Sequence, residues 1–450
     1  MTTETTAAPA PTAASTNSGG LGANYWKLWA SSAASNLADG VFWIAFPLLA
    51  IRLTDSPILI AGVAVVGRLP WLVFVLVAGA LADRLDRRRT MIGVAILRTL
   101  ISLGIAVTIV TSTESLWLLY LTAFVLGVGE TLFDTAAQAV MPSIVKRDEL
   151  SKANGRLYAA ELTMNQFVGP PLGGFLAGVA IAFAFAGSAL AFAFAAVALM
   201  LLTGSYKPVR AETAGPRPSV VADIREGLSY LWHHRLLRTL AIMVGTMNLA
   251  SSATFAVFVL YAVAPGPMGL DEFGFGVLMT GMAIGSLGGS LVVERVERRL
   301  GRARLLTMAV ILNAVTVAIP GLTTNAWIVG ASFAVAGVGI VMWNVVTVSL
   351  RQRIVPDALL GRLNASYRLL AWGSQPIGAL LGGLIGQWLG LPAVFLIAGV
   401  VVALLLFLRR IITDEAIGAA EAEGDAEAAR LVSATAAPAD GAPDAISTPA

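Results

Sequence analysis

The stretch that decides the fold is residues 79–90, Gly-Ala-Leu-Ala-Asp-Arg-Leu-Asp-Arg-Arg-Arg-Thr, where charge is concentrated between two long apolar runs. The apolar runs extend from about residue 58 to residue 110. Two apolar segments of spanning length joined by a short cationic turn are typical of a pair of membrane helices, and such turns stay on the cytoplasmic side. The turn therefore predicts a membrane protein and the side of the membrane on which this loop lies.

The composition favours the same class. Of 450 residues, 57% are hydrophobic and 13% are charged, whereas about 25% of the residues of soluble domains are charged. The 45 glycines suit helices that pack closely in lipid. The absence of cysteine excludes disulfides, thiolate metal sites and cysteine nucleophiles. The net charge of +3 comes from cations in loops between apolar runs, which indicates membrane topology and not nucleic-acid binding.

Twelve apolar runs, each near the roughly 20 residues that a bilayer requires, can be marked along the chain. They lie at about residues 28–51, 58–82, 91–110, 116–140, 157–177, 180–203, 240–263, 275–293, 305–322, 326–350, 369–388 and 392–408. The predicted fold is an all-α membrane protein with twelve transmembrane helices.

The composition also predicts the organisation of the chain. Residues 25–203 form an N-terminal six-helix half and residues 239–410 a C-terminal six-helix half, joined by a polar cytoplasmic loop at 204–238. Residues 1–24 and 411–450, rich in Ala, Thr, Pro, Glu and Asp, bury little apolar surface, so we expect two disordered cytoplasmic tails.

Loop charge predicts the orientation. Lys and Arg gather in alternate loops, while the loops at 111–115, 264–273 and 323–325 carry neither, and Arg52 is the exception on that side. Both termini should therefore face the cytoplasm. We expect a monomeric multi-pass protein of the cell (inner) membrane.

An internal repeat relates the two halves. Residues 144–174 resemble residues 354–383 at a separation of about 210, and the charged turn has a degenerate partner that begins at Gly289. Both copies of the charged turn lie on the cytoplasmic side, which predicts two parallel repeats related by an axis along the membrane normal.

With these features, the turn Gly79-x-Leu81-x-Asp83-Arg84-x-x-Arg87-Arg88 between the second and third spans closely resembles the signature of the major facilitator superfamily. The resemblance implies a secondary transporter. One residue departs from the family pattern, because Asp86 stands where the family usually has glycine in a tight turn.

Finer motifs resemble one branch of that superfamily, the enterobactin and macrolide exporters. They are Asn36-x-x-Asp39-Gly40, Leu53-Thr54-Asp55-Ser56-Pro57, Asp83-Arg84-Leu85-Asp86-Arg87-Arg88 and Glu130-Thr131-Leu132-Phe133-Asp134. The resemblance implies export of a small amphipathic molecule of the drug, macrolide or siderophore type.

The resemblance also implies a cytoplasmic latch between the halves, made by Gly79, Asp83, Arg84, Arg87 and Asp134. Asp83 would face the start of the eleventh span, and Arg87 would pair with Asp134. A carboxylate at a helix N-terminus and a paired buried carboxylate are both physically favourable. The alternative is that these arginines only fix the side of the membrane on which the loop lies. We prefer this alternative for Arg88 and Arg89.

Ionisable residues inside spans are costly and are therefore functional candidates. Asp39 lies near the middle of the first span, and Glu161 and Glu130 lie on the fifth and fourth spans. A desolvated carboxyl that changes exposure can carry a proton. Asp39 and Glu161 are the preferred carriers, Glu130 is the more structural candidate, and a static ion pair with Arg68 or Arg98 is an equal alternative.

Small residues in the fifth span, Gly169, Pro170, Gly173 and Gly174, partly resemble an antiporter motif, but close packing and a proline kink explain them as well. Several apolar side chains could line a substrate cavity or simply pack. They are Phe42, Trp43, Trp71, Met243, Met247, Phe255 and Trp343. The C-terminal half offers neutral polar groups at depth, namely Asn248, Asn313, Asn344 and Gln375.

No phosphate-binding glycine loop, metal-ligand cluster or nucleophile motif is present in the sequence, so we expect neither an enzyme nor a bound cofactor or metal. The expected partners are a small-molecule substrate, protons and the lipid bilayer, and no nucleic acid. The leading hypothesis is a proton-driven exporter. An importer is the nearer alternative, and a non-transporting membrane receptor of the same fold is the more distant one.

Overall fold

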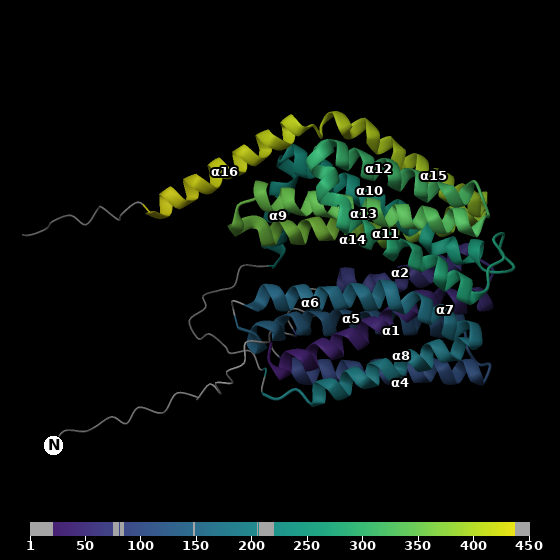
Figure 1. Cartoon of the computed structure of the whole chain (residues 1–450). Coiled ribbons are helices and arrows are strands. Elements are labelled where there is room, and N and C mark those ends of the chain that lie inside the picture. The colour runs from purple at the N-terminus through teal and green to yellow at the C-terminus, as the bar shows by residue number, and fades with distance from the viewer. Residues whose placement is uncertain are drawn as a thin grey trace, which may run out of the picture.

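The structure, a computed structural model, describes residues 21–74, 81, 85–146, 149–204, 206 and 220–436. These residues are almost entirely helical (Figure 1). In the N-terminal part the elements are α1 (Ala23–Leu53), α2 (Pro57–Val73), α4 (Arg87–Val110), α5 (Leu116–Ile144), α6 (Leu150–Leu162), the π-helix η2 (Thr163–Val168), α7 (Gly169–Val179) and α8 (Ile181–Met200). They are followed by α9 (Val220–His233), α10 (Arg235–Ala262), α11 (Glu272–Leu300), α12 (Arg302–Ala318), η3 (Ile319–Gly321), α13 (Ala326–Ile354), α14 (Asp357–Leu389), α15 (Leu391–Leu404), η4 (Leu405–Arg410) and α16 (Asp414–Ala436).

These helices make twelve membrane spans. Within the described residues, ten helical segments are long and apolar enough to cross a bilayer. The shorter apolar helix α2 supplies the second span, and α6, η2 and α7 together supply the fifth as one continuous helical path from Leu150 to Val179. The predicted all-α fold with twelve transmembrane helices is confirmed.

Local sequence explains where the spans begin. Side chains that precede a helix accept hydrogen bonds from its first free N–H groups. Ser115 accepts from Leu118 N at 3.3 Å before α5, Asp271 from Gly274 N at 2.7 Å before α11, and Asn325 from Trp327 N at 2.9 Å before α13. The loops thus fix the ends of these helices.

The packing inside each half repeats. In the N-terminal half α1 packs on α7 and α8, α4 on α5 and α8, and α2 on α5. In the C-terminal half the helices at equivalent places make equivalent pairs, since α10 packs on α14 and α15, α12 on α13 and α15, and α11 on α13. The predicted parallel six-helix repeats are therefore present.

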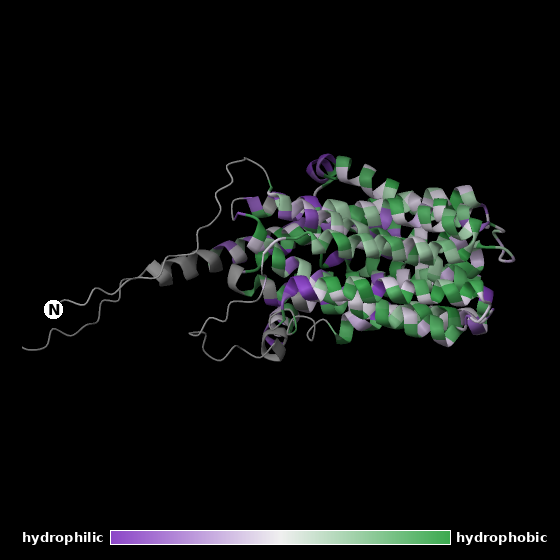
Figure 2. Cartoon of the chain, turned by 90° about the horizontal axis from the view of Figure 1, so that it is seen from below, coloured by the Kyte–Doolittle hydropathy of each residue, from purple (hydrophilic) through white to green (hydrophobic). Residues whose placement is uncertain are grey.

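The two halves meet through a symmetric pair of helix contacts, α2 with α14 and α11 with α7 (Figure 1). We call the end where α1 and α10 begin the near end, and the end where they finish, at Leu53 and Ala262, the far end. Polar residues gather at the near end of the molecule, while the spans between the two ends are largely apolar (Figure 2).

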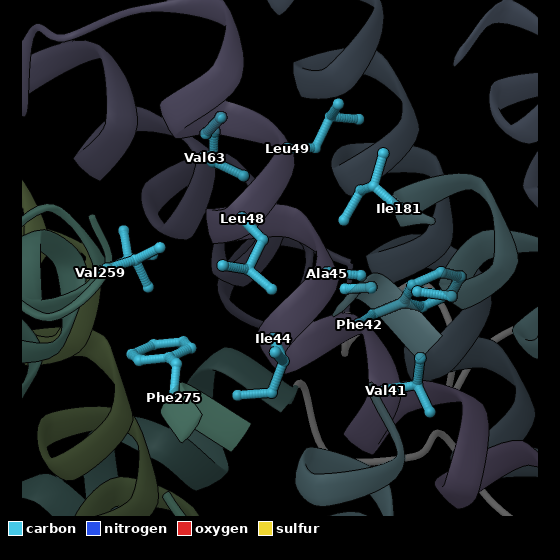
Figure 3. Packing of buried hydrophobic residues seen from close by; sticks show 14 of the residues in the cluster. Val41, Phe42, Ile44, Ala45, Leu48, Leu49, Val63, Ile181, Val259 and Phe275 are labelled. Atoms are coloured by element: carbon cyan, nitrogen blue, oxygen red, sulfur yellow. The ribbon is translucent and has the colours of Figure 1, made fainter. Parts of the chain in front are cut away.

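Among the described residues, the largest buried hydrophobic cluster that connects the two halves lies at the far end. At the far end, Leu48 and Val63 of the N-terminal half belong to one buried cluster with Val259 and Phe275 of the C-terminal half (Figure 3). At the near end each half has a buried cluster of its own. The described residues are thus packed across the halves at the far end.

The central segment corrects one detail of the sequence analysis. Residues 204–238, expected to be a polar loop, include α9 and the first residues of α10. Arg362 of α14 donates to Glu226 of α9 at 2.9 Å, and a Cβ added at Gly227 would lie 2.3 Å from the carbonyl oxygen of Arg362. This close approach shows why a short polar helix can pack on the C-terminal half.

The segment after residue 410 is a second correction, because residues 414–436 form α16 where we expected a disordered tail. Its buried residues Ile417 and Ala420 join the near-end cluster of the C-terminal half. Glu421 pairs with Arg302 and, at 3.6 Å, with Arg353. The expected N-terminal tail, 1–24, lies mostly outside the described residues, and α1 already begins at Ala23.

Candidate functional site

A buried ion pair lies in the N-terminal half between α1 and α4. A guanidinium nitrogen of Arg98 donates to Asp39 Oδ1, and its other terminal nitrogen donates to Ser35 Oγ at 3.0 Å. Arg98 is 1% exposed and Asp39 9% exposed. Charges removed from water are tolerated when they are paired and hydrogen-bonded. Both terminal nitrogens of Arg98 meet this requirement, while its buried Nε has no hydrogen-bond partner among the described residues. Of the two arginines considered as partners for Asp39, the structure selects Arg98.

Neighbouring helices shape the space around Arg98. The guanidinium carbon lies 4.0 Å from the ring centre of Phe192 on α8, which is a cation–π arrangement. A Cβ added at Gly129 on α5 would lie 2.9 Å from Arg98 Cδ, so glycine provides the room for this side chain. The roles of Phe192 and Gly129 were missed in the sequence, which gives no signal for either.

Other charges surround the pair. Glu130 on α5 and Arg68 on α2 are close enough to act electrostatically on Asp39, and Glu130 also acts on Glu161 and Asp134. All three proton-coupling candidates therefore share one region of the N-terminal half. Such a group of carboxyls and arginines can exchange partners when protonation changes.

Glu161 differs from Asp39 in its surroundings. Glu161 lies on α6 and is exposed. Arg368, on α14 of the opposite half, acts on it electrostatically. Arg368 in turn lies 4.3 Å from the ring centre of Trp372, which contacts Trp71 of the N-terminal half edge-on at 5.5 Å. Glu161 is thus within electrostatic reach of the opposite half.

The predicted cytoplasmic latch is described only in part. Gly79, Asp83 and Arg84 lie outside the described residues. Arg87 donates to the carbonyl oxygen of Ala139 on α5 at 2.9 Å, and the half-buried Asp134 lies on the same helix. The pairing of Arg87 with Asp134 stays a prediction.

The rest of the charged turn supports helix ends. Arg88 donates to the carbonyl oxygens of Leu199 and Met200, at 3.0 and 2.7 Å, where α8 ends. Asp86 Oδ1 accepts from Arg89 N at 3.1 Å and caps α4. The backbone of Asp86 is extended, with φ −66° and ψ 110°, so this position needs no glycine and the departure from the family pattern is explained.

The small residues of the fifth span lie at close crossings. A Cβ added at Gly169 would lie 2.5 Å from the Cα of Gly40 on α1, one residue after Asp39. A Cβ added at Gly174 would lie 2.9 Å from the Cα of Gly276 on α11. Gly173 likewise faces α1, and Pro170 lies at the first turn of α7. The fifth span thus packs against α1, the helix that carries Asp39, and against α11 of the opposite half.

Two polar contacts join the halves at the far end. Arg52 at the end of α1 pairs with Glu272 at the start of α11 at 3.0 Å. Ser56 Oγ and Gln387 Oε1 lie 2.9 Å apart, joining the start of α2 to the end of α14. Arg52 was the single cation among the far-end loops of the sequence, and that exception was the signal that could have identified this contact.

Residues 22–439 match the family model described as "Transmembrane secretion effector". The chain belongs to the transmembrane secretion effector family. This family of major facilitator transporters accounts for the fold and the signature turn, and the predicted membership of the exporter branch of that superfamily is confirmed. Its members are membrane transporters and not enzymes, and the same holds for this chain.

Alignments with known relatives cover most of this chain. Macrolide efflux protein A of Streptococcus pyogenes is 24% identical over 401 residues, covering 84% of this chain and 94% of that protein. The multidrug efflux pump Tap of Mycolicibacterium fortuitum is 28% identical over 374 residues, covering 80% and 88%. The enterobactin exporter EntS of Shigella boydii serotype 4 (strain Sb227) is 24% identical, covering 77% and 81%.

Solved structures show the same fold as this chain. A bacterial homologue of the iron transporter ferroportin in an inward-facing state superposes with a TM-score of 0.66 at 16% identity, covering 86% of this chain and 98% of that one. A bacterial homologue of the lysosomal transporter Spinster gives 0.61 at 12% identity, covering 90% and 97%.

Proposed function

We propose that this transporter exports a small amphipathic molecule of the drug, macrolide or siderophore type from the cytoplasm, by alternating access and in exchange for protons. The observation that carries the proposal is the buried Asp39–Arg98 pair with Glu130 and Glu161 nearby. The export direction is supported by the relatives, whose names describe macrolide, multidrug and enterobactin efflux.

The orientation is part of the proposal. Several cationic segments lie at the near end, namely Arg87 and Arg88 at the start of α4, the basic end of α11 and the basic end of α13. Because cations are retained in cytoplasmic loops, we place the near end, both termini and α16 in the cytoplasm, in the cell (inner) membrane of a bacterium. The packed far end then faces outward, which suits a state that takes up substrate from the cytoplasm.

The coupling mechanism follows from the charges. When Asp39 is ionised it holds Arg98, and when it is protonated that interaction weakens and Arg98 can turn to Glu130 or substrate. Glu161 changes its exposure as α14 approaches or leaves. One proton moving inward across about 100 mV supplies about 2.3 kcal/mol, which is sufficient to drive a conformational step. We expect the transporter to work as a monomer.

Inside-out proteoliposomes test the proposal directly. With an acidic lumen, we expect uptake of ethidium or erythromycin that collapses when the pH gradient is removed. Glu161→Gln should keep downhill flux and lose the gradient-driven component. The Asp39→Asn/Arg98→Gln double variant should do the same, and Glu415→Gln on the exposed start of α16 is the matched control.

Three results would contradict the proposal. Gradient-driven uptake that persists unchanged in both variants removes the coupling assignment. Uptake in the opposite sense identifies an importer. No flux of any tested compound under any gradient favours the non-transporting receptor.

A further inference from the structure

The C-terminal half contains a cavity of about 190 Å³ that is separate from the charged group in the N-terminal half. It lies among α10, α11, α12, α13 and α15. Aromatic and methionine side chains, with Met247, Phe255, Phe258, Phe333 and Trp343 among them, form part of its walls, and neutral polar and aliphatic residues form the rest. None of its described lining residues carries a charge. Such walls suit a compact apolar or aromatic group.

Two buried polar atoms of the described lining residues have no hydrogen-bond partner, the side-chain oxygen of Asn313, an acceptor, and the indole nitrogen of Trp343, a donor. Asn313 of α12 is 7% exposed, and its side-chain oxygen makes no hydrogen bond. Three other polar side chains of the lining already donate to backbone oxygens, Asn248 Nδ2 to Ala371 O at 2.7 Å, Thr254 Oγ1 to Ser251 O at 2.8 Å and Thr316 Oγ1 to Leu312 O at 2.8 Å. A buried acceptor without a partner is costly, and a ligand with an O–H or N–H group can satisfy it.

The cavity is also accessible and of useful size. Asn344 on α13 belongs to its lining and is exposed, so the space is not sealed. A dry engineered cavity of about 150 Å³ holds benzene. The cavity here can therefore hold one or two fused rings with a small substituent.

We propose that this cavity is a binding site for an uncharged aromatic group that donates a hydrogen bond to Asn313. The inference rests on the proposed function, because it assigns the uncharged part of the substrate to the C-terminal half. The charges of the N-terminal half then remain available for protons. Binding and coupling are thus divided between the two repeats.

Indole and 1-methylindole form a matched pair of probes, since they differ in the N–H donor. Saturation-transfer NMR titrations on the purified full chain in detergent, without any gradient, measure their affinities. We expect indole to bind about fivefold more tightly than 1-methylindole. Asn313→Leu should bring the ratio close to one, and Ala336→Phe, which fills the cavity, should abolish binding of both.

Asn36→Leu is the matched control, because Asn36 is also 7% exposed but lies in the N-terminal half with its amide donating to Ser32 O at 2.9 Å. It should keep the fivefold ratio. Thermal unfolding identifies variants that fail to fold, and the two cavity variants act independently, so loss of one leaves the other informative. Equal affinities in the wild type, or unchanged indole binding in Ala336→Phe, would overturn the site.

The two proposals fail in different ways. If the indole pattern holds but no proton-driven flux is seen, the site stands and the proposed transport falls. If flux is seen but the indole pattern does not hold, the transporter stands and this cavity is only a packing void.

Discussion

The charges of Asp39 and Arg98 stabilise each other, because both side chains are buried away from water. Arg98 is held from three sides, by the carboxylate of Asp39, the hydroxyl of Ser35 and the ring of Phe192. Removing one partner of such a pair leaves an uncompensated charge, whereas removing both leaves a neutral site. The pair is therefore expected to show strong coupling in stability measurements.

We predict that Asp39→Asn lowers the free energy of unfolding by about 3–5 kcal/mol, because the Arg98 charge stays buried alone. Arg98→Gln should have a similar effect, and the double variant should recover most of the loss. Thermal unfolding in detergent measures all three. Arg295→Gln, at an exposed position of α11, serves as control. Additive losses in the double variant would show that the two residues do not act as a pair.

A second prediction concerns the cap of α4. Asp86→Ala removes the acceptor for Arg89 N and should cost about 1 kcal/mol, while Asp86→Asn should cost little. Asp86→Gly, which restores the residue usual in the family, should cost only a few tenths of a kcal/mol. Asp55→Ala in a far-end loop is the control for loss of a surface carboxylate. A clear gain in stability from glycine would contradict the cap.

The sequence was sufficient to single out Asp39 but not its partner. Arg68 and Arg98 lie on neighbouring spans, and composition does not fix how each helix is rotated. The rotation is set by packing, in which Gly129 makes room beside α5 for Arg98. Arg68 instead lies over the ring of Trp43, 4.6 Å from its centre.

Helices were predictable from the sequence where an apolar run is long enough to span a bilayer. They were less predictable elsewhere. Segments such as α5 and α13 are marked by a capping residue followed by a long apolar run. α16 is rich in Ala and Glu, and within residues 414–426, the part of this helix whose burial is described, only Ile417, Ala420 and Gly424 are buried. Its position depends on Arg302 and Arg353, which are distant in the chain, so composition alone predicted a disordered tail.

The contacts of α16 give a third prediction. Asp414 Oδ1 accepts from Ala303 N at 3.0 Å and caps α12 from a distant part of the chain, while Glu421 pairs with Arg302 and Arg353. Glu421→Ala should therefore speed hydrogen exchange in α16 and at the start of α12, without affecting the N-terminal half. Hydrogen-exchange mass spectrometry tests this, with Glu415→Ala as control. Unchanged exchange would mean that apolar packing alone holds α16.

At the scale of the whole molecule, the halves are two repeats joined by equivalent contacts, α2 with α14 and α11 with α7. At the far end they also share a hydrophobic cluster and two polar contacts, Arg52 with Glu272 and Ser56 with Gln387. The repeat was visible in the sequence. The sequence did not indicate which end is packed. An arrangement closed at the near end and one closed at the far end use the same helices, and they differ only in the tilt of one half relative to the other.

A fourth prediction concerns the far-end ion pair. It is partly exposed, so its contribution to overall stability should be small. Glu272→Gln should leave the unfolding temperature nearly unchanged but shift the population toward an outward-open state. Labelling of a cysteine placed at Val63, which is buried in the shared far-end cluster, should become faster. Labelling rates that stay equal to those of the parent cysteine variant would exclude this role.

The most direct test locks the far end. Because the chain has no cysteine, Arg52→Cys/Glu272→Cys can be joined by a short, reducible thiol crosslinker without side reactions. Proton-driven ethidium uptake by inside-out proteoliposomes is measured before crosslinking, after it, and after reduction. Alternating access predicts that uptake stops on crosslinking and returns on reduction, while each single-cysteine variant stays active. Full-rate uptake with the crosslink complete would contradict the account.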